Sequence, residues 1–129
     1  MNSQALTIIK QTLEQEALLD FSVIVGSQAK GEASPASDWD IAIQWSYSMP
    51  LEQQLANTEH LRHRLAHALG VEHNKIDLIN APTAKLAMKA CIANEGVELT
   101  GAASLEWRHF LQRTWRELED YYWDELYIA

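Results

Sequence analysis

Positive charge is scarce in this sequence, and its scarcity narrows the classes of function. Ten Lys and Arg residues stand against 18 Asp and Glu residues, for a formal net charge of −8 at pH 7. Proteins that bind the phosphate backbone of nucleic acids need a basic surface stripe, so we expect no direct nucleic-acid binding. An acidic surface is better suited to a basic partner.

Cysteine and long apolar runs are scarce as well. Cys91 is the only cysteine, so no disulfide can form within the chain and a reducing cytoplasm is the expected compartment. No apolar stretch is long enough to cross a bilayer, and the polar N-terminus does not resemble a signal peptide. We therefore predict a cytoplasmic protein without membrane attachment, folded as a single domain over residues 1–129.

Hydrophobic periodicity predicts an α+β fold, with a small mixed β-sheet covered by helices on one face. Strands are predicted at 21–25, 39–45 and 75–80, and the run at 96–99 is compatible with a short fourth strand. Helices are predicted at 3–18, at 51–69, from Pro82 to about Asn94, and at about 104–127. The helix at 51–69 carries a leucine stripe, and the C-terminal helix is amphipathic.

The sequence "DWDIAIQW" places two carboxylates at the head of a strand. Residues two apart in a strand point to the same side, so Asp38 and Asp40 share one face. Like charges this close bind protons more tightly unless a cation lies between them, and hard oxygen ligands favour Mg²⁺ or Mn²⁺. An ordinary solvent-facing strand edge would show the same Asp-x-Asp pattern, so the motif alone leaves both interpretations open.

Two further features point to the same place. Gly26 and Ser27 end the strand at 21–25, where a glycine allows a ligand to approach the backbone and a helix start offers free N–H groups; Ser27 could equally be an ordinary N-cap. Asp77 lies in the otherwise apolar strand at 75–80, where it would supply a third metal ligand or pair with Lys75.

The run Gly26-Ser27, ten residues, then Asp38-Trp39-Asp40 resembles the Gly-Ser-x(10)-Asp-x-Asp signature of DNA polymerase β-like nucleotidyltransferases. The chain is similar to the minimal nucleotidyltransferases (MNT) that act as antitoxins in HEPN/MNT toxin–antitoxin systems. The resemblance covers residues 21–80. Many relatives carry arginines after Gly-Ser, whereas this chain has Gln28 and Lys30, and lysine is a point charge rather than a bidentate fork.

The resemblance implies a mechanism. Asp38, Asp40 and Asp77 would be the catalytic residues and would hold two Mg²⁺ ions, with Mn²⁺ as a substitute, and Asp77 would take the proton from the attacking hydroxyl. Gly26, Ser27 and Lys30 would bind the phosphates of ATP, the substrate. AMP would pass to a tyrosine hydroxyl of a cognate HEPN-domain toxin, an RNase, and silence it. The chain would then be an antitoxin acting as a protein adenylyltransferase (an AMPylating enzyme) in complex with its toxin.

Other features favour plainer interpretations. His60, His63 and His67 share one helix face opposite the leucine stripe, which favours a solvated face over a metal site. Cys91 is expected to be a small core residue. The aromatic, acidic ending at 118–129 predicts a helix packed on the domain or, on another face, a surface that docks a partner.

Two alternatives to the adenylyltransferase remain open from the sequence. The chain could be a non-catalytic antitoxin or binding module that neutralises its partner by occlusion. It could also be a nucleotidyltransferase for a small molecule, of the antibiotic-modifying type, although a chain of 129 residues offers no obvious second domain to shape such a pocket.

Overall fold

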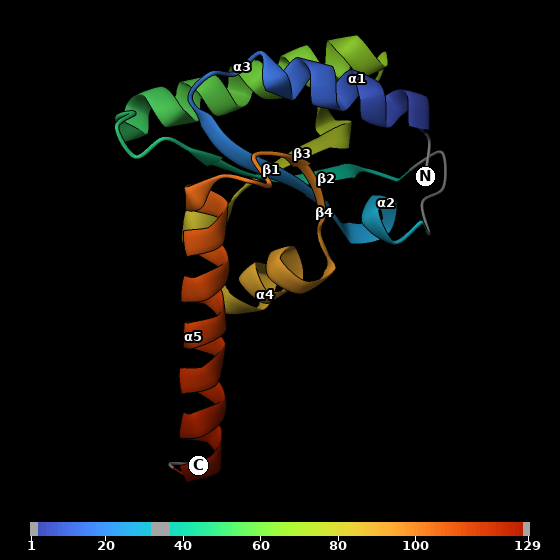
Figure 1. The fold of residues 1–129 in the computed structure, drawn as a ribbon. Coiled ribbons are helices and arrows are strands. Elements are labelled where there is room, and N and C mark those ends of the chain that lie inside the picture. The colour runs from blue at the N-terminus through green and yellow to red at the C-terminus, as the bar shows by residue number, and fades with distance from the viewer. Residues whose placement is uncertain (1–2, 32–36, 128–129) are drawn as a thin grey trace.

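A four-stranded mixed sheet forms the centre of the fold in the computed structural model, which describes residues 3–31 and 37–127 (Figure 1). Part of the ten-residue gap between Gly-Ser and Asp-x-Asp, at 32–36, lies outside the described residues. The strands are β1 (Leu19–Val25), β2 (Trp39–Trp45), β3 (Ile76–Asn80) and β4 (Val97–Thr100). Their spatial order is β3-β2-β1-β4; β1 is antiparallel to β2 and β4, and β2 is parallel to β3.

Five α-helices surround the sheet in the described part of the chain. They are α1 (Ser3–Glu14), α2 (Gly26–Lys30), α3 (Leu51–Leu69), α4 (Leu86–Glu95) and α5 (Leu105–Tyr127). Short 3₁₀ turns at His73–Lys75 and Ala81–Thr83 flank β3. The predicted α+β class and the mixed sheet are confirmed. The first helix is four residues shorter than the predicted 3–18, because its last residues form a turn in which the Gln15 and Glu16 N–H groups bond to Thr12 and Leu13.

Local signals explain the bounds of α3. Pro50 precedes its first residue, where a fixed φ and a missing N–H cost nothing. Gly70 ends it in the left-handed region at φ +69°, and the N–H of Val71 reaches back to the Ala66 carbonyl. Glycine adopts this conformation without a steric penalty, which is why the helix stops here. The leucine stripe predicted for this helix runs from Leu51 through Leu55, Leu61 and Leu65 to Leu69. The prediction was wrong for Leu51 and Leu55, whose side chains are exposed.

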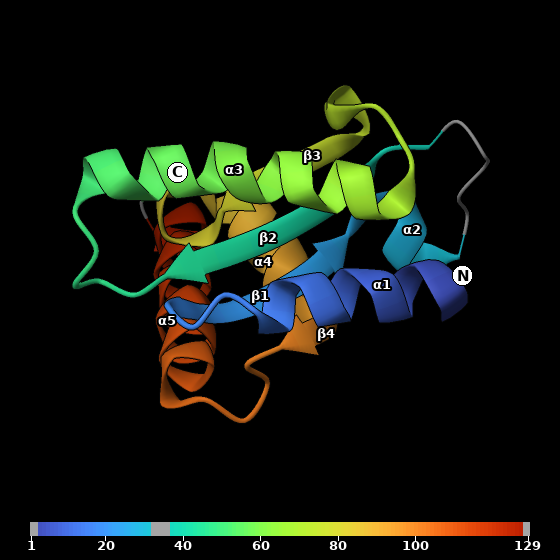
Figure 2. The ribbon, with the colours of Figure 1, turned by 90° about the horizontal axis from the view of Figure 1, so that it is seen from above.

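Helices cover both faces of the sheet, which corrects the prediction that they cover one face (Figures 1 and 2). α1 and α3 lie over the face formed by alternate β2 residues, as predicted. They pack against Trp39, Ile41, Ile43 and Trp45. The second face packs against α4 and α5 through Phe21, Val23 and Ala42.

The sequence of β1 contains the reason for this correction. Its run "FSVIV" is apolar at nearly every position, which is typical of a strand buried on both faces. Phe21 anchors α5 on the second face: its ring centroid lies 4.8 Å from that of Trp107 and 5.4 Å from that of Phe110. The polar positions of β2 on this face, Asp40 and Gln44, are therefore partly buried rather than on an open side. None of the helices in the described ranges is both long and apolar enough to span a membrane.

Candidate active site

Strand pairing brings two of the predicted acids side by side. Asp40 and Asp77 are direct partners in the parallel register of β2 and β3, so their Cα atoms are about 4.8 Å apart. Because paired residues of neighbouring strands point to the same face, both carboxylates lie on the α4 side of the sheet. Asp38 lies two residues before Asp40, just outside β2. The three acids thus gather at one end of the sheet.

Gly26 holds the Asp40 carboxylate from the other side. Val25, the last residue of β1, is the antiparallel partner of Asp40, and the chain turns immediately afterwards at Gly26 with φ +76°. A Cβ atom on Gly26 would lie 2.5 Å from Oδ2 of Asp40. Only glycine therefore fits this position, both for its backbone conformation and for the space that the carboxylate fills.

The charges at this site are not balanced within the protein. Burial raises the pKa of Asp40, and the neighbouring carboxylates of Asp77 and Asp38 raise it further. Burial and both neighbouring charges disfavour the ionised form of Asp40. A bound cation would offset the repulsion from Asp77 and Asp38. The repulsion predicted between Asp38 and Asp40 is therefore present, and it raises the pKa of Asp40.

Lys75 forms an ion pair with Asp38. Its Nζ lies 3.9 Å from Oδ1 of Asp38, and both side chains are about half exposed. The strand register explains the contact. Trp39 and Ile76, the first residues of β2 and β3, are paired, so the residues that precede them, Asp38 and Lys75, are also neighbours. Asp77, for which pairing with Lys75 was the alternative, has an exposed side chain and is not buried without compensation.

The donors of this cluster fit a hard divalent cation, but the three carboxylates do not converge on one point. Among residues 3–31 and 37–127, no three His, Cys, Asp or Glu side chains are arranged to hold a metal ion. Asp40 and Asp77 are adjacent, while the Asp38 carboxylate points to Lys75. Three carboxylates in mutual repulsion suit Mg²⁺ or Mn²⁺, provided that Asp38 leaves Lys75.

The Gly-Ser turn leads into α2, beside the acids. Ser27 is partly buried, and the Gln28 side chain is buried at 7% exposure. The predicted phosphate ligand Lys30 is at the far end of this five-residue helix, where its Nζ lies 3.6 Å from Oε2 of Glu95 in α4. Gly26 and Ser27 therefore border the acid cluster, whereas the Lys30 ammonium is directed to α4.

Comparison with known proteins identifies the family. The family model described as polymerase beta, nucleotidyltransferase, matches residues 8–104, well over half of the chain. This chain is a polymerase β-type nucleotidyltransferase. The family predicted from the Gly-Ser and Asp-x-Asp motifs is confirmed. A search of curated proteins finds no match.

Solved structures share the fold of this nucleotidyltransferase over nearly its whole length. A toxin–antitoxin with AMP-PNP superposes with a TM-score of 0.72 at 20% identity, covering 95% of this chain and 94% of that chain. The toxin–antitoxin MntA–HepT gives 0.67 at 18% identity, with 98% and 95% covered. A tri-AMPylated Shewanella oneidensis HEPN toxin in complex with MNT antitoxin gives 0.68 at 19% identity, with 99% and 95% covered. At these identities the likeness establishes the fold.

Cys91 borders the site, which the sequence did not indicate. Its Sγ lies 3.6 Å from Oε2 of Glu95, and the backbone of Gly26 is near enough to influence the pKa of the thiol. Burial, followed by the charge and hydrogen bond of Glu95, raises the pKa of the thiol, against smaller effects of Lys30 and Gly26. Cys91 was expected to be a small core residue, and this is correct in part. Its side chain is half-buried and packs against the core between the sheet and helices α4 and α5. No local pattern could place a residue of α4 against the turn after β1.

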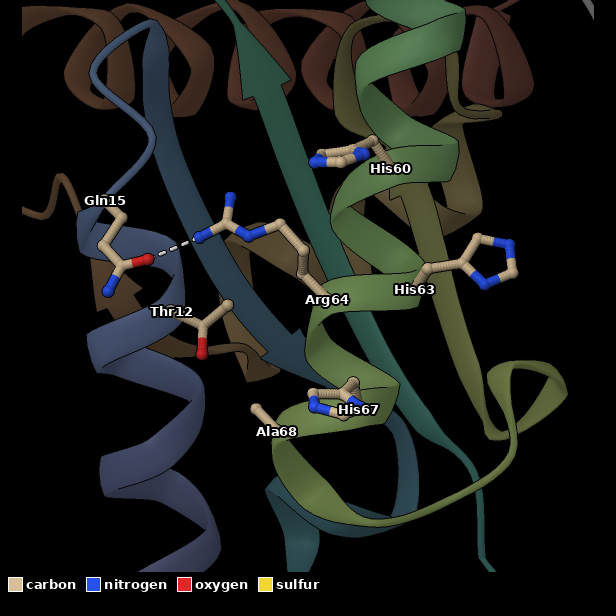
Figure 3. Close-up of a pocket in the computed structure, with 7 residues that line it drawn as sticks. All are labelled: Thr12, Gln15, His60, His63, Arg64, His67 and Ala68. Carbon is tan, nitrogen blue, oxygen red and sulfur yellow. Dashed lines mark hydrogen bonds between the residues drawn. The ribbon is translucent and has the colours of Figure 1, made fainter.

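The three histidines of α3 lie on the opposite side of the sheet from the acids and line an open hollow of about 450 Å³ beside α1 (Figure 3). His60, His63 and His67 are exposed, as predicted, and the ring of His63 points away from those of the other two. Arg64, between them, is bound to Gln15 at 2.5 Å and to Glu16. His63 meets His73 with ring centroids 4.9 Å apart. These contacts describe a solvated helix face.

Proposed function

We propose that this nucleotidyltransferase is an antitoxin that transfers AMP from ATP to a tyrosine hydroxyl of a HEPN-domain toxin. The observation that carries the proposal is the pairing of Asp40 with Asp77 against Gly26, with Asp38 two residues away. The family membership and the fold shared with toxin–antitoxin complexes, one with AMP-PNP and one with a tri-AMPylated HEPN toxin, support the choice of substrate and partner.

Each site residue has a role in this proposal. Asp38, Asp40 and Asp77 would hold divalent magnesium, which when bound would supply charge stabilisation for the phosphates during the transfer. The backbone around Gly26 and the Ser27 hydroxyl would bind the triphosphate beside the acid cluster, because the turn at Gly26 brings the start of α2 next to Asp40. Asp77 has the exposed carboxylate of the pair, and so it is the group that can accept a proton from an approaching hydroxyl.

The transfer balances without any further reactant. The tyrosine oxygen attacks the α-phosphorus, a new P–O bond forms, and the bond to the bridging oxygen of the β-phosphate breaks. The hydroxyl proton passes to Asp77, and pyrophosphate leaves. The products are an AMP ester on the toxin and pyrophosphate.

Two lysines must change partner for this reaction. Lys75 leaves Asp38, and Lys30 leaves Glu95 if it is to contact a phosphate. Both ion pairs are about half exposed, and exposed pairs contribute only about 0–1 kcal/mol. A triphosphate offers each ammonium a stronger partner, so neither pair is a serious barrier to binding.

The same ion pairs support a second candidate function. A non-catalytic antitoxin that neutralises its toxin by occlusion would keep Asp38 on Lys75 permanently. Incubation with ATP labelled at the α-phosphate, Mg²⁺ and the proposed HEPN-domain toxin separates the two. The adenylyltransferase gives a toxin that is heavier by whole AMP units on a tyrosine in mass spectrometry. Neutralised toxin of unchanged mass would support occlusion.

A further inference from the structure

The C-terminal part of α5 projects beyond the body of the protein as an arm (Figure 1). Near the middle of α5, Trp115 Nε1 donates to Asn94 Oδ1 of α4, and Lys89 Nζ of α4 pairs with Glu117 Oε1, both at 3.4 Å. We define the arm as residues 119–127. Every side chain from Glu119 to Leu126 is exposed. At about 1.5 Å per residue the arm is roughly 13 Å long.

The arm continues an apolar stripe away from the core. The stripe consists of Trp115, Leu118, Tyr122 and Leu126, whose spacing of three and four residues places them on one helix face. Trp115, Tyr122 and Leu126 are 48%, 62% and 76% exposed. Large apolar side chains gathered on one exposed helix face are typical of a protein-binding surface, with aromatic residues as its anchors.

The charges of the arm indicate the kind of partner. It carries four carboxylates, Glu119, Asp120, Asp124 and Glu125, and no Lys or Arg. No basic residue occupies the last turn of α5. Carboxylates near a helix C-terminus are unfavourable, because the helix dipole is negative at that end. A cationic surface would relieve this repulsion while an apolar groove covers the stripe.

Neither a second copy nor a membrane fits these charges. Two arms packed together would bring eight carboxylates into one interface, and like charges across an interface cost affinity. Anionic lipid surfaces attract basic helices and repel acidic ones. The complementary occupant is a protein with an apolar groove and a rim of Lys or Arg.

We propose that the α5 arm is the docking element of this protein, and that its stripe enters an apolar, basic-rimmed groove on the toxin. This inference rests on the proposed function for the identity of the partner. The arm binds while the acids at the sheet perform the transfer, so the two can fail separately. The arm holds the toxin, and the acid cluster modifies it.

The chain offers a matched pair of variants. Tyr122→Ser with Leu126→Ser removes the outer half of the stripe. Trp123→Ser is the control: Trp123 is also 62% exposed, but it lies about 100° away from Tyr122 around the helix. All three side chains are exposed, so the fold and the binding of Mg-ATP, measured by circular dichroism and calorimetry, are expected to be unchanged.

Binding of the proposed HEPN-domain toxin, as the full-length protein, is then measured by calorimetry, with AMP transfer measured in parallel. The stripe variant is expected to weaken the Kd at least about 30-fold, and Trp123→Ser less than about threefold. Weakening of wild-type binding by salt is also expected, because acidic and basic groups meet at the rim.

Each other outcome decides a separate claim. If the stripe variant binds like the wild type, or if Trp123→Ser weakens binding equally, the docking role of the stripe is wrong, whatever the AMP transfer. If the wild type binds no toxin, or self-associates through the stripe, the chosen occupant is wrong. If the wild type binds through the stripe but transfers no AMP, the docking surface stands and the proposed chemistry fails.

Discussion

Gly26 and the carboxylate of Asp40 are packed so closely that no side chain fits between them. The close approach follows from topology: β1 ends at Val25, the antiparallel partner of Asp40, and the chain turns away at once. The left-handed φ of Gly26 makes that turn possible, and the missing Cβ leaves room for Oδ2 of Asp40. One residue therefore determines both the path of the chain and the position of a candidate metal ligand.

Gly26→Ala is expected to weaken metal binding, and Gly70→Ala is its matched control. Both glycines have φ near +70°, so alanine at either costs about 1–2 kcal/mol of stability. A Cβ on Gly70 meets nothing within 4 Å, whereas one on Gly26 meets Asp40. Mn²⁺ affinity, measured by calorimetry on the folded proteins, should fall at least about tenfold for Gly26→Ala alone. Equal Mn²⁺ affinities in the two variants would refute the positioning role of Gly26.

Asp40→Asn is expected to make the metal-free protein more stable at neutral pH. The pKa of Asp40 is raised on folding, so the folded state binds its proton more tightly than the unfolded state does. The ionised carboxylate therefore costs stability above its folded-state pKa, and that cost disappears as the pH falls through the pKa to below the unfolded value. Thermal unfolding should show a Tm for Asp40→Asn a few degrees higher at pH 7, with the gap closing in acid.

The same measurement with added Mn²⁺ provides the control for this prediction. A bound cation neutralises the repulsion from Asp38 and Asp77, so Mn²⁺ should raise the Tm of the wild type more than that of Asp40→Asn. If the wild type is more stable than Asp40→Asn at pH 7 without metal, the repulsion among the three carboxylates does not destabilise the fold and the prediction is wrong.

Lys75→Gln is expected to tighten divalent metal binding in the absence of nucleotide. Lys75 competes for Asp38, and an exposed ion pair contributes up to about 1 kcal/mol, so the gain in Mn²⁺ affinity should be about two- to fivefold. Lys10→Gln, on the exposed side of α1, removes the same charge far from the acids and should leave the affinity unchanged. Weaker Mn²⁺ binding by Lys75→Gln would mean that Lys75 does not compete with metal.

Lys30 and Glu95 are expected to affect ATP binding in opposite directions. Lys30→Met should raise the KM for ATP, because a phosphate loses a cation. Glu95→Gln should lower that KM by up to about fivefold, because Lys30 no longer has to leave a carboxylate. Glu14→Gln, an exposed acid on α1, controls for net charge. A KM unaffected by either substitution at the pair would remove Lys30 from the phosphate-binding residues.

Much of the fold was predictable because its signals are local. The strict alternation of apolar and polar residues at 39–45 predicted both ends of β2. Pro50 and Gly70 predicted both ends of α3. The second covered face was missed because it depends on α4 and α5 returning to β1. The apolar run of β1 indicated burial on both faces, but not which helices provide it.

The residues of the candidate site could be predicted from the sequence, but the contacts between them could not. The spacing of Asp38 and Asp40 predicts their shared face, whereas the register that pairs Asp40 with Asp77 depends on strand order. The contacts of Lys75 with Asp38, and of Cys91 with the turn at Gly26, join residues distant in the sequence. No periodicity encodes such contacts, so only the folded chain reveals them.

Transfer of AMP to the toxin by wild type and Asp40→Asn tests the central claim most directly. Both proteins are incubated with the proposed HEPN partner, Mg²⁺ and ATP labelled at the α-phosphate, and the tyrosine-bound label is quantified. We predict labelled toxin with the wild type and a loss of at least about 100-fold with Asp40→Asn, while toxin binding is unchanged. Equal labelling by the two proteins, or no labelling by a wild type that binds the toxin, would contradict the account.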